Sequence, residues 1–194
     1  MKKKKKETNF YKPINQLLLF NYDEYFTLLK DLYQKKLFNK CNIFTGPKGI
    51  GKATFIYHFI NYILSLNESN KYSIANYAIS SNNFTYKRVI NNSHPNLHII
   101  DNEAGNEKIK VDQVRNLLKF LNKTTYTQDL KIVIIDNFEK FNLNSSNALL
   151  KSIEEPPNNT YFFIIHDNSY KILETIKSRS VEFKIHFNKE NKEE

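Results

Sequence analysis

Residues 46–53 have the sequence Gly46-Pro-Lys-Gly-Ile-Gly-Lys-Ala53, so that a glycine is followed by four residues and then by Gly-Lys. This is the spacing of a phosphate-binding loop, and the stretch lies between an apolar run and a segment with helical periodicity. Glycines let backbone N–H groups close around a phosphate chain, and Lys52 can reach the outer phosphates. The stretch predicts a nucleotide site, with ATP as ligand, formed by Gly46, Pro47, Lys48, Gly49, Ile50, Gly51, Lys52, Ala53 and Thr54.

Ala53 departs from the usual pattern of such a loop. A Ser or Thr at this position supplies the hydroxyl that holds magnesium, and alanine has none. A nucleotide bound here would lack one of its metal anchors, so we expect ATP to bind weakly. The alternative is a glycine-rich turn between a strand and a helix that binds nothing, because short motifs also occur by chance.

Composition places limits on the class of protein. The formal charge is +9, but Lys2–Lys6 supply five of the 29 basic residues, which leaves 24 basic against 20 acidic residues, or +4. The folded part is therefore mildly basic, and composition alone gives little support for nucleic-acid binding. No run approaches the roughly 18 apolar residues of a membrane span, and no signal peptide follows the lysines. We expect a cytoplasmic protein that does not bind membranes.

Cysteine and histidine usage argues against a metal site. Cys41 is the single cysteine, which excludes an internal disulfide framework, and its place at the start of an apolar strand indicates a buried side chain. His94 and His98 flank Pro-Asn-Leu, but no third ligand of a suitable type lies nearby. They are therefore interpreted as a loop histidine and a strand-edge histidine, and no metal site is predicted.

Apolar periodicity predicts alternating strands and helices. Buried strands are expected at Cys41–Phe44, Lys131–Asp136 and Tyr161–Ile165, a further strand at Leu97–Ile100, and a last strand with alternating residues at Val181–Ile185. Helices are expected after caps at Asp23 and Asp112, along the apolar positions Phe55 to Leu66, at Ser145–Glu154 after a cap at Asn144, and from Tyr170 to about Lys177. Alternation of this kind, with a phosphate loop after the first strand, predicts an α/β domain whose parallel sheet carries helices on both faces.

The domain is expected to span residues 21–187. Residues 1–20 are interpreted as a basic tail and lead-in, and residues 188–194 as a disordered tail. Asn67–Asn96 is expected to be irregular apart from a helix around Tyr72–Ile79, and Asn102–Glu107 to form a polar turn. These segments are rich in polar residues and lack a clear apolar period.

Asp136 ends the most apolar strand, Lys131-Ile-Val-Ile-Ile-Asp136. Open α/β sheets place ligands at the carboxyl ends of their strands, so Asp136 is the candidate carboxylate that steadies magnesium. An ATPase of this type usually has a glutamate next, which orients the attacking water, but here the residue is Asn137, and Glu139 is expected to point elsewhere. Ala53 and Asn137 together argue against efficient hydrolysis.

Several motifs occur in a characteristic order. They are the phosphate loop through Thr54, His94-Pro95, Val111-Asp-Gln-Val-Arg115, Ile134-Ile-Asp136, Asn147-Ala-Leu-Leu-Lys-Ser-Ile-Glu-Glu-Pro-Pro157 and Ser178-Arg-Ser180. From about Asn21 to Ile185 the chain resembles the N-terminal P-loop NTPase domain of the delta-prime subunits of bacterial DNA polymerase III clamp loaders, which belong to the AAA+ group. The Asn-Ala-Leu-Leu-Lys block joined to the Ser-Arg-Ser triplet is the most specific part of this resemblance.

The resemblance implies a role in placing a sliding clamp on primed DNA, in a complex with tau or gamma subunits and the delta subunit. It also implies that Arg179 completes the ATP site of a neighbouring subunit, as the arginine of the Ser-Arg-Cys motif does in this family. Ser180 replaces the usual cysteine. No cysteine occurs between Asn67 and His94, so the zinc module of many relatives is not expected. The resemblance covers only the first domain of full-length relatives, so we do not expect their lid and collar domains in this sequence.

The leading hypothesis is a clamp-loader subunit that does not hydrolyse ATP itself and that lends Arg179 to a partner. The runner-up is an active ATPase of the tau or gamma type. A third hypothesis is a domain used only for interaction, whose loop is architectural.

Overall fold

The structure is a computed structural model, which describes residues 12–101, 109, 111–123, 130–141 and 143–187. The described residues form two compact units. Unit 1 is drawn from Met1–Phe38 and Gly51–His94, and unit 2 from Asn39–Ile50 and Pro95–Glu194. Residues 1–11 of the predicted tail and lead-in 1–20, the predicted tail 188–194 and the predicted polar turn Asn102–Glu107 lie outside the described residues.

Unit 1 contains the short 3-10 helix η2 (Pro13–Asn15) and the helices α1 (Asp23–Gln34), α2 (Lys52–Leu64) and α3 (Phe84–Ile90). Its core is aromatic. Phe26 of α1 is fully buried and lies with its ring centroid 5.6 Å from that of Phe59 and 5.1 Å from that of Tyr72. Aromatic pairs at such separations add to the stability gained from burial of their surface. Of the apolar stripe predicted for the second helix, Phe55, Phe59, Tyr62 and Ile63 are confirmed as core, whereas Leu66 lies beyond the end of α2 and is exposed.

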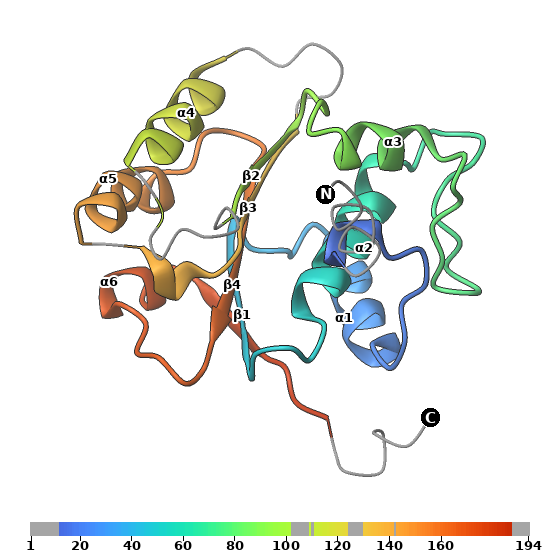
Figure 1. The fold of residues 1–194 in the computed structure, drawn as a ribbon, viewed down its shortest axis with the longest axis horizontal. Helices are drawn as coiled ribbons and strands as arrows, with labels where there is room; N and C mark the ends of the chain where they lie inside the picture. The colour runs from blue at the N-terminus through green and yellow to red at the C-terminus, as the bar shows by residue number, and fades with distance from the viewer. Residues whose placement is uncertain (1–11, 102–108, 110, 124–129, 142, 188–194) are drawn as a thin grey trace, which may run out of the picture. The chain divides into compact units, whose positions relative to one another are not determined.

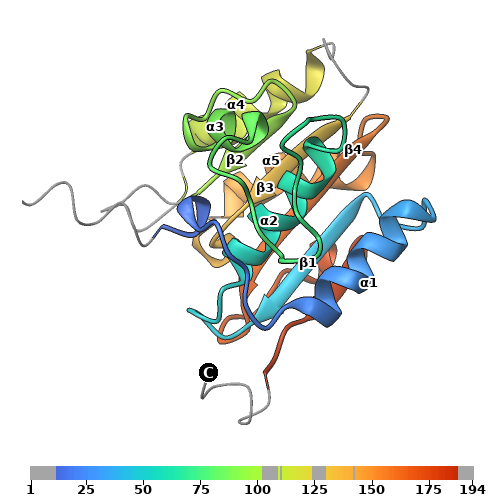
Figure 2. The same cartoon turned by 90° about the vertical axis from the view of Figure 1, so that its right-hand side faces the viewer.

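Unit 2 is built on one sheet of five strands in the order β2-β3-β4-β1-β5, and all the neighbouring strands are parallel. The strands are β1 (Cys41–Gly46), β2 (Leu97–Ile100), β3 (Lys131–Ile135), β4 (Thr160–Asp167) and β5 (Val181–Lys184). Figure 2 shows β1, β3 and β4 running side by side. The prediction of a parallel α/β sheet is confirmed, and all five predicted strands are present.

Helices α4 (Val111–Asn122), α5 (Leu143–Glu154) and α6 (Glu174–Lys177) lie along one side of this sheet (Figure 1). Alternate strand residues such as Val133, Ile135 and Phe162 pack there against buried helix residues, which include Val114, Leu117, Leu149, Ile153 and Ile176. The 3-10 helix η3 (Phe138–Lys140) follows β3. On the opposite face, the rings of Phe163, Phe44 and Phe183 stack across β4, β1 and β5. Both faces of the strands are thus apolar, as the continuous β-branched runs indicated.

Three expectations for helices were wrong. The segment Tyr72–Ile79 is not helical, because the backbone groups of Ser73 and Ala78 pair with each other and Tyr77 has a φ of +45°. Helix α6 spans only Glu174–Lys177, since Leu173 before it is extended. Helix α3 arises within the stretch that was expected to be irregular.

The predicted helix caps were each displaced by one or two positions. Helix α1 begins at Asp23, with Tyr22 as its N-cap. Asp112 and Asn144 lie inside the first turns of α4 and α5. An acidic residue in a first turn still stabilises the helix, because it faces the positive end of the dipole. Pro156 and Pro157 follow α5 directly, as predicted.

Candidate functional site

In the sheet of unit 2, the candidate site residues lie at opposite ends of the strands. Because all strands are parallel, their carboxyl ends lie together, and Gly46 of β1 and Asp136 after β3 are at this carboxyl-end edge of the sheet. Strand β4 lies between β1 and β3. Arg179 precedes β5, whose first residue Val181 is paired with Asn42 near the start of β1. At about 3.3 Å per strand residue, the two edges are roughly 15 Å apart.

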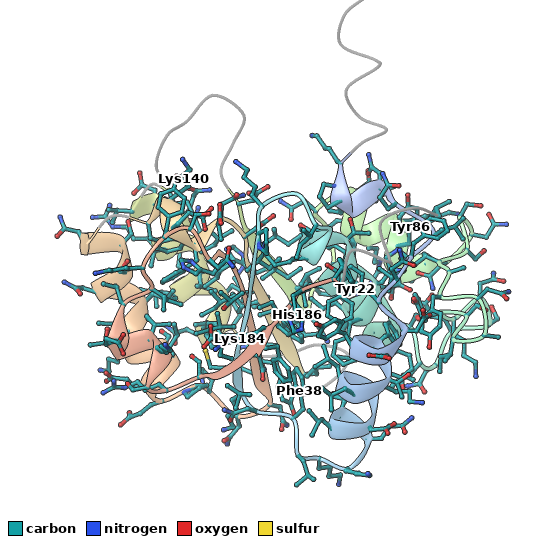
Figure 3. The ribbon with its side chains drawn as sticks, turned by 90° about the horizontal axis from the view of Figure 1, so that it is seen from below. Tyr22, Phe38, Tyr86, Lys140, Lys184 and His186 are labelled. Atoms are coloured by element: carbon teal, nitrogen blue, oxygen red, sulfur yellow. The ribbon has the colours of Figure 1, made fainter. Side chains whose placement is uncertain are left out.

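Gly46 ends β1 where no side chain fits. A Cβ at this position would lie 2.5 Å from the backbone oxygen of Ile185, whose N–H donates to Thr45 O at 2.7 Å. Ile185 follows β5, and the neighbouring residues Lys184 and His186 are labelled in Figure 3. The first glycine of the predicted loop is therefore required for the close approach of the chain after β5.

The remaining residues of the loop have the local geometry that the motif requires. Gly49 and Gly51 have φ values of +86° and +90°, a region that residues with a side chain rarely adopt. Helix α2 begins directly afterwards at Lys52, which is 6% exposed. Ala53 and Thr54 are half-buried in the first turn, whereas Pro47 and Lys48 are exposed and Ile50 is half-buried. The predicted sequence of strand, glycine turn and helix is confirmed.

Asn137 directly follows Asp136, at the position where an ATPase of the expected type has a glutamate. Its φ is +54°, its N–H donates to Asp136 Oδ1 at 2.8 Å, and its side-chain amide donates to Asp101 Oδ1 at 2.8 Å. An amide in this position cannot accept a proton from water as a carboxylate does. Asp101 follows β2 in the way that Asp136 follows β3, so the strand-end pattern could have marked it as a site residue.

Glu139 is directed toward the end of β4. Its Oε2 accepts the Asp167 N–H at 3.3 Å and lies 3.7 Å from His166 Nδ1, and both side chains are almost fully buried. His166 Nε2 is 2.9 Å from Tyr170 O and must donate to it, because a carbonyl only accepts. Asp167 is paired in register with Gly46. Glu139 thus fixes the strand next to the loop, and the sequence alone did not indicate this contact between η3 and β4.

Arg179 lies on the surface at the amino-end edge of the sheet. Its Nη2 is 2.9 Å from Glu154 Oε1, and both side chains are about 40% exposed. Its Nη1 donates to Thr175 O at 3.0 Å and to Ser178 Oγ at 3.2 Å. Within unit 2, Arg179 is therefore separated by the length of β1 from Gly46 and from Asp136.

Ser180 anchors the chain beside Arg179. Its hydroxyl is 2.8 Å from Ile176 O and 3.0 Å from the sulfur of Cys41, which is 1% exposed. Burial raises the pKa of the Cys41 thiol to about 11. The prediction that Cys41 is a buried apolar residue is confirmed, because a thiol with this pKa stays protonated at neutral pH.

The histidines have the structural roles that the sequence indicated. His98 lies in the edge strand β2 and stacks on Phe120 of α4, and burial lowers its pKa. His94 lies in the loop before β2. Among the residues that the structure describes, no group of three or more His, Cys, Asp or Glu side chains is placed to hold a metal ion. Within the same part of the chain, no helix has the length and apolar character needed to cross a bilayer.

The chain matches known proteins over most of its length. The family model described as DNA polymerase III, delta subunit, matches residues 22–190. A DNA polymerase III subunit delta' of Pseudomonas aeruginosa is 31% identical over 137 residues, which cover 71% of this chain and 40% of that protein. The subunit delta' of Buchnera aphidicola subsp. Schizaphis graminum is 30% identical over 148 residues, covering 76% of this chain and 43% of that protein. The chain spans less than half the length of these relatives.

A solved structure shares the fold. The gamma subunit-related protein of Thermotoga maritima is similar with a TM-score of 0.56 and 20% identity, over 84% of this chain and 47% of that one. With the strand order β2-β3-β4-β1-β5, this likeness confirms the predicted fold class, an α/β domain with a parallel sheet. The family match over residues 22–190 and the delta-prime relatives then place the sequence: the chain belongs to the DNA polymerase III delta-subunit family, as a delta-prime-like member.

Proposed function

We propose that this chain is a subunit of a DNA polymerase III clamp loader, which does not hydrolyse ATP itself and which supplies Arg179 to the ATP site of a neighbouring subunit. In this role it would act in the cytoplasm with tau or gamma and delta subunits, on a sliding clamp and primed DNA. The observation that carries the proposal is the position of Arg179 at the edge of the sheet opposite Gly46 and Asp136. An arginine placed there can serve a nucleotide held by another chain more easily than one held by its own.

The chemistry of a guanidinium suits this role. Arginine keeps its positive charge at all physiological pH values and offers donors in a planar fork that matches phosphate oxygens. An arginine delivered across an interface stabilises the charge that develops on a transferring phosphoryl group. The short helix α6 and the anchored Ser180 fix the backbone on both sides of Arg179. These features support an arginine that is presented from a rigid surface.

Three residues support the absence of hydrolysis by this chain. Ala53 lacks the hydroxyl that would hold magnesium, and Asn137 lacks a carboxylate that could orient water. Glu139, the nearest glutamate along the chain, is turned toward Asp167 and His166. With neither the metal hydroxyl nor the water-orienting glutamate, the loop would lack two parts of the hydrolytic machinery.

The loop residues fit a phosphate group in part. Gly49 and Gly51, which have positive φ values, carry no Cβ that could shield the neighbouring backbone N–H groups. The space beside Gly49 is open, because a Cβ there would meet nothing within 4 Å. If ATP binds, the loop N–H groups and Lys52 are the candidates to contact its phosphates, and Asp136 is the candidate residue for its magnesium. We therefore propose weak ATP binding, without zinc.

Purified chain should not hydrolyse ATP above the level of the Lys52→Ala variant, because that variant removes the charge that would reach the outer phosphates. Phosphate release with and without primed DNA measures this rate. Turnover by the wild-type chain that Lys52→Ala abolishes would favour an ATPase of the tau or gamma type instead. ATP-dependent thermal stabilisation that is lost in Lys52→Ala would support binding at the loop and argue against a purely architectural loop.

Membership of the complex is tested by a pull-down of the tagged chain with tau and delta subunits of the same organism. Retention of both subunits after washing at physiological salt supports the proposal. Failure to retain either subunit, with a chain that is folded by circular dichroism, contradicts it.

A further inference from the structure

The Arg179 guanidinium is folded back onto its own chain. Nη1 donates to Thr175 O, four residues earlier, and to Ser178 Oγ, while Nη2 is 2.9 Å from the Glu154 carboxylate. These contacts engage both terminal nitrogens of the side chain. The same two nitrogens would make paired hydrogen bonds with phosphate oxygens.

The two partners are held by a rigid frame. Ile153, next to Glu154, and Ile176, three residues before Arg179, are both buried in the apolar core of unit 2. Helices α5 and α6 also contact each other. The backbone of the pair is therefore fixed, and what can change is the side chain of Arg179, which is about 40% exposed. An exposed ion pair is weak enough to open when a more strongly charged partner arrives.

We infer that Glu154 is a latch for Arg179. The carboxylate holds the guanidinium against α6 in the free chain and is replaced by the phosphates of a nucleotide on the neighbouring subunit. The second half of this inference rests on the function proposed above, whereas the first half concerns this chain alone. A triphosphate carries more negative charge than one carboxylate and accepts hydrogen bonds from the same planar guanidinium. Replacement of the Glu154 carboxylate by phosphate is therefore favoured once the complex is assembled.

The latch has a consequence for the regulation of the complex. While Glu154 neutralises the guanidinium, Arg179 offers less charge to any phosphate, so an isolated or misassembled chain is a poor activator. Glu154 is thus a positioning residue, which acts through Arg179 and does not touch the nucleotide.

The holding contact can be measured on the isolated chain by the rate at which phenylglyoxal modifies Arg179, read by peptide mass spectrometry. Arg115 is the internal reference, because it forms a separate exposed pair with Asp112 at 2.9 Å. Glu154→Gln should raise the rate at Arg179 roughly two- to fivefold, the range expected for an exposed ion pair, and leave the rate at Arg115 unchanged. Glu155→Gln, at the neighbouring exposed residue, is the matched control and should change neither rate. Equal rates in wild type and Glu154→Gln would overturn the latch, whatever the complex does.

The releasing step is measured in the reconstituted complex by its DNA-stimulated ATPase rate at limiting ATP. Glu154→Gln should raise the rate at the one site that Arg179 serves by a similar factor, because no carboxylate competes for the guanidinium. A rate that falls as it does for Arg179→Ala would mean that Glu154 holds the working geometry, and would overturn the competition. If phenylglyoxal shows the latch but Arg179→Ala leaves the ATPase unchanged, the holding contact stands and the proposed function fails.

Discussion

At the scale of single residues, His58 of α2 shows how a buried polar group is kept neutral. Its Nε2 is 3.1 Å from Gln16 O, which can only accept, so this nitrogen carries the proton. Its Nδ1 therefore accepts from the Tyr72 hydroxyl, also at 3.1 Å. Both ring nitrogens are satisfied in the neutral form, and a second proton would force the Tyr72 hydroxyl to accept a hydrogen bond instead of donating one. Burial lowers the pKa of His58 to about 4.

This arrangement predicts an acid-sensitive stability. An unfolded histidine titrates near 6.5, so below this pH the unfolded chain binds a proton that the folded chain does not. The free energy of unfolding should fall as the pH drops from 6.5 toward 4, by about 2 kcal/mol at pH 5 from this residue alone. Urea unfolding at pH 7.5 and at pH 5 measures the difference. His58→Gln should reduce this difference in the free energy of unfolding by about 2 kcal/mol. An unchanged difference in the variant would contradict the conclusion that His58 is neutral in the folded chain.

Some residues of the candidate site were predictable one by one, and others were not. Gly46 and Asp136 follow from the loop spacing and from the strand-end rule, both of which are local in the sequence. The Glu154 contact of Arg179 joins residues 25 positions apart through the packing of α5 on α6, and no local pattern encodes it. The opposite placement of Arg179 and Gly46 likewise depends on which strands are neighbours.

At the scale of elements, α3 was the helix that the sequence concealed. Asn83 caps it, with a side-chain oxygen that accepts the Tyr86 N–H at 2.6 Å and the Asn61 amide at 2.9 Å, and the Glu68 carboxylate accepts the N–H groups of Phe84 and Thr85. Asparagine is so frequent in this region that a capping asparagine has no contrast with its surroundings. The long apolar strands were predictable, because their residue types alone demand burial on two faces.

Loss of this cap should destabilise unit 1. Asn83 is fully buried and its amide also donates to Asn70 O at 2.8 Å, so Asn83→Ala removes the cap and leaves buried partners unpaired. The free energy of unfolding should fall by about 1–3 kcal/mol. Thermal or urea unfolding followed by circular dichroism provides the measurement. Asn82→Ala, at the exposed neighbouring position, is the control, and an equal effect of the two substitutions would show that the capping network is unimportant.

At the scale of the whole molecule, the loop and Arg179 differ in what they could contribute to ATP hydrolysis. The fold keeps a phosphate-type loop, yet Ala53 and Asn137 remove two groups that hydrolysis uses. Arg179 precedes β5 beside the amino end of β1, whereas Gly46 lies at the carboxyl end of β1. These features are the basis of the proposal that the chain is one component of a larger assembly, in which ATP is hydrolysed on another subunit.

The most direct test of this account is the DNA-stimulated ATPase rate of a clamp loader reconstituted from subunits of the same organism. Arg179→Ala in this chain should lower the rate at the one ATP site that it serves by about 10³-fold, in the range of other arginines supplied in trans. The melting temperature of the isolated chain should stay unchanged. Arg115→Ala, which removes an exposed arginine of α4, should have no effect on the rate. Because other sites in the complex continue to turn over, single-turnover phosphate release should show the loss of one site's burst. An unchanged burst and rate in Arg179→Ala, with the variant still bound in the complex, would contradict the central claim.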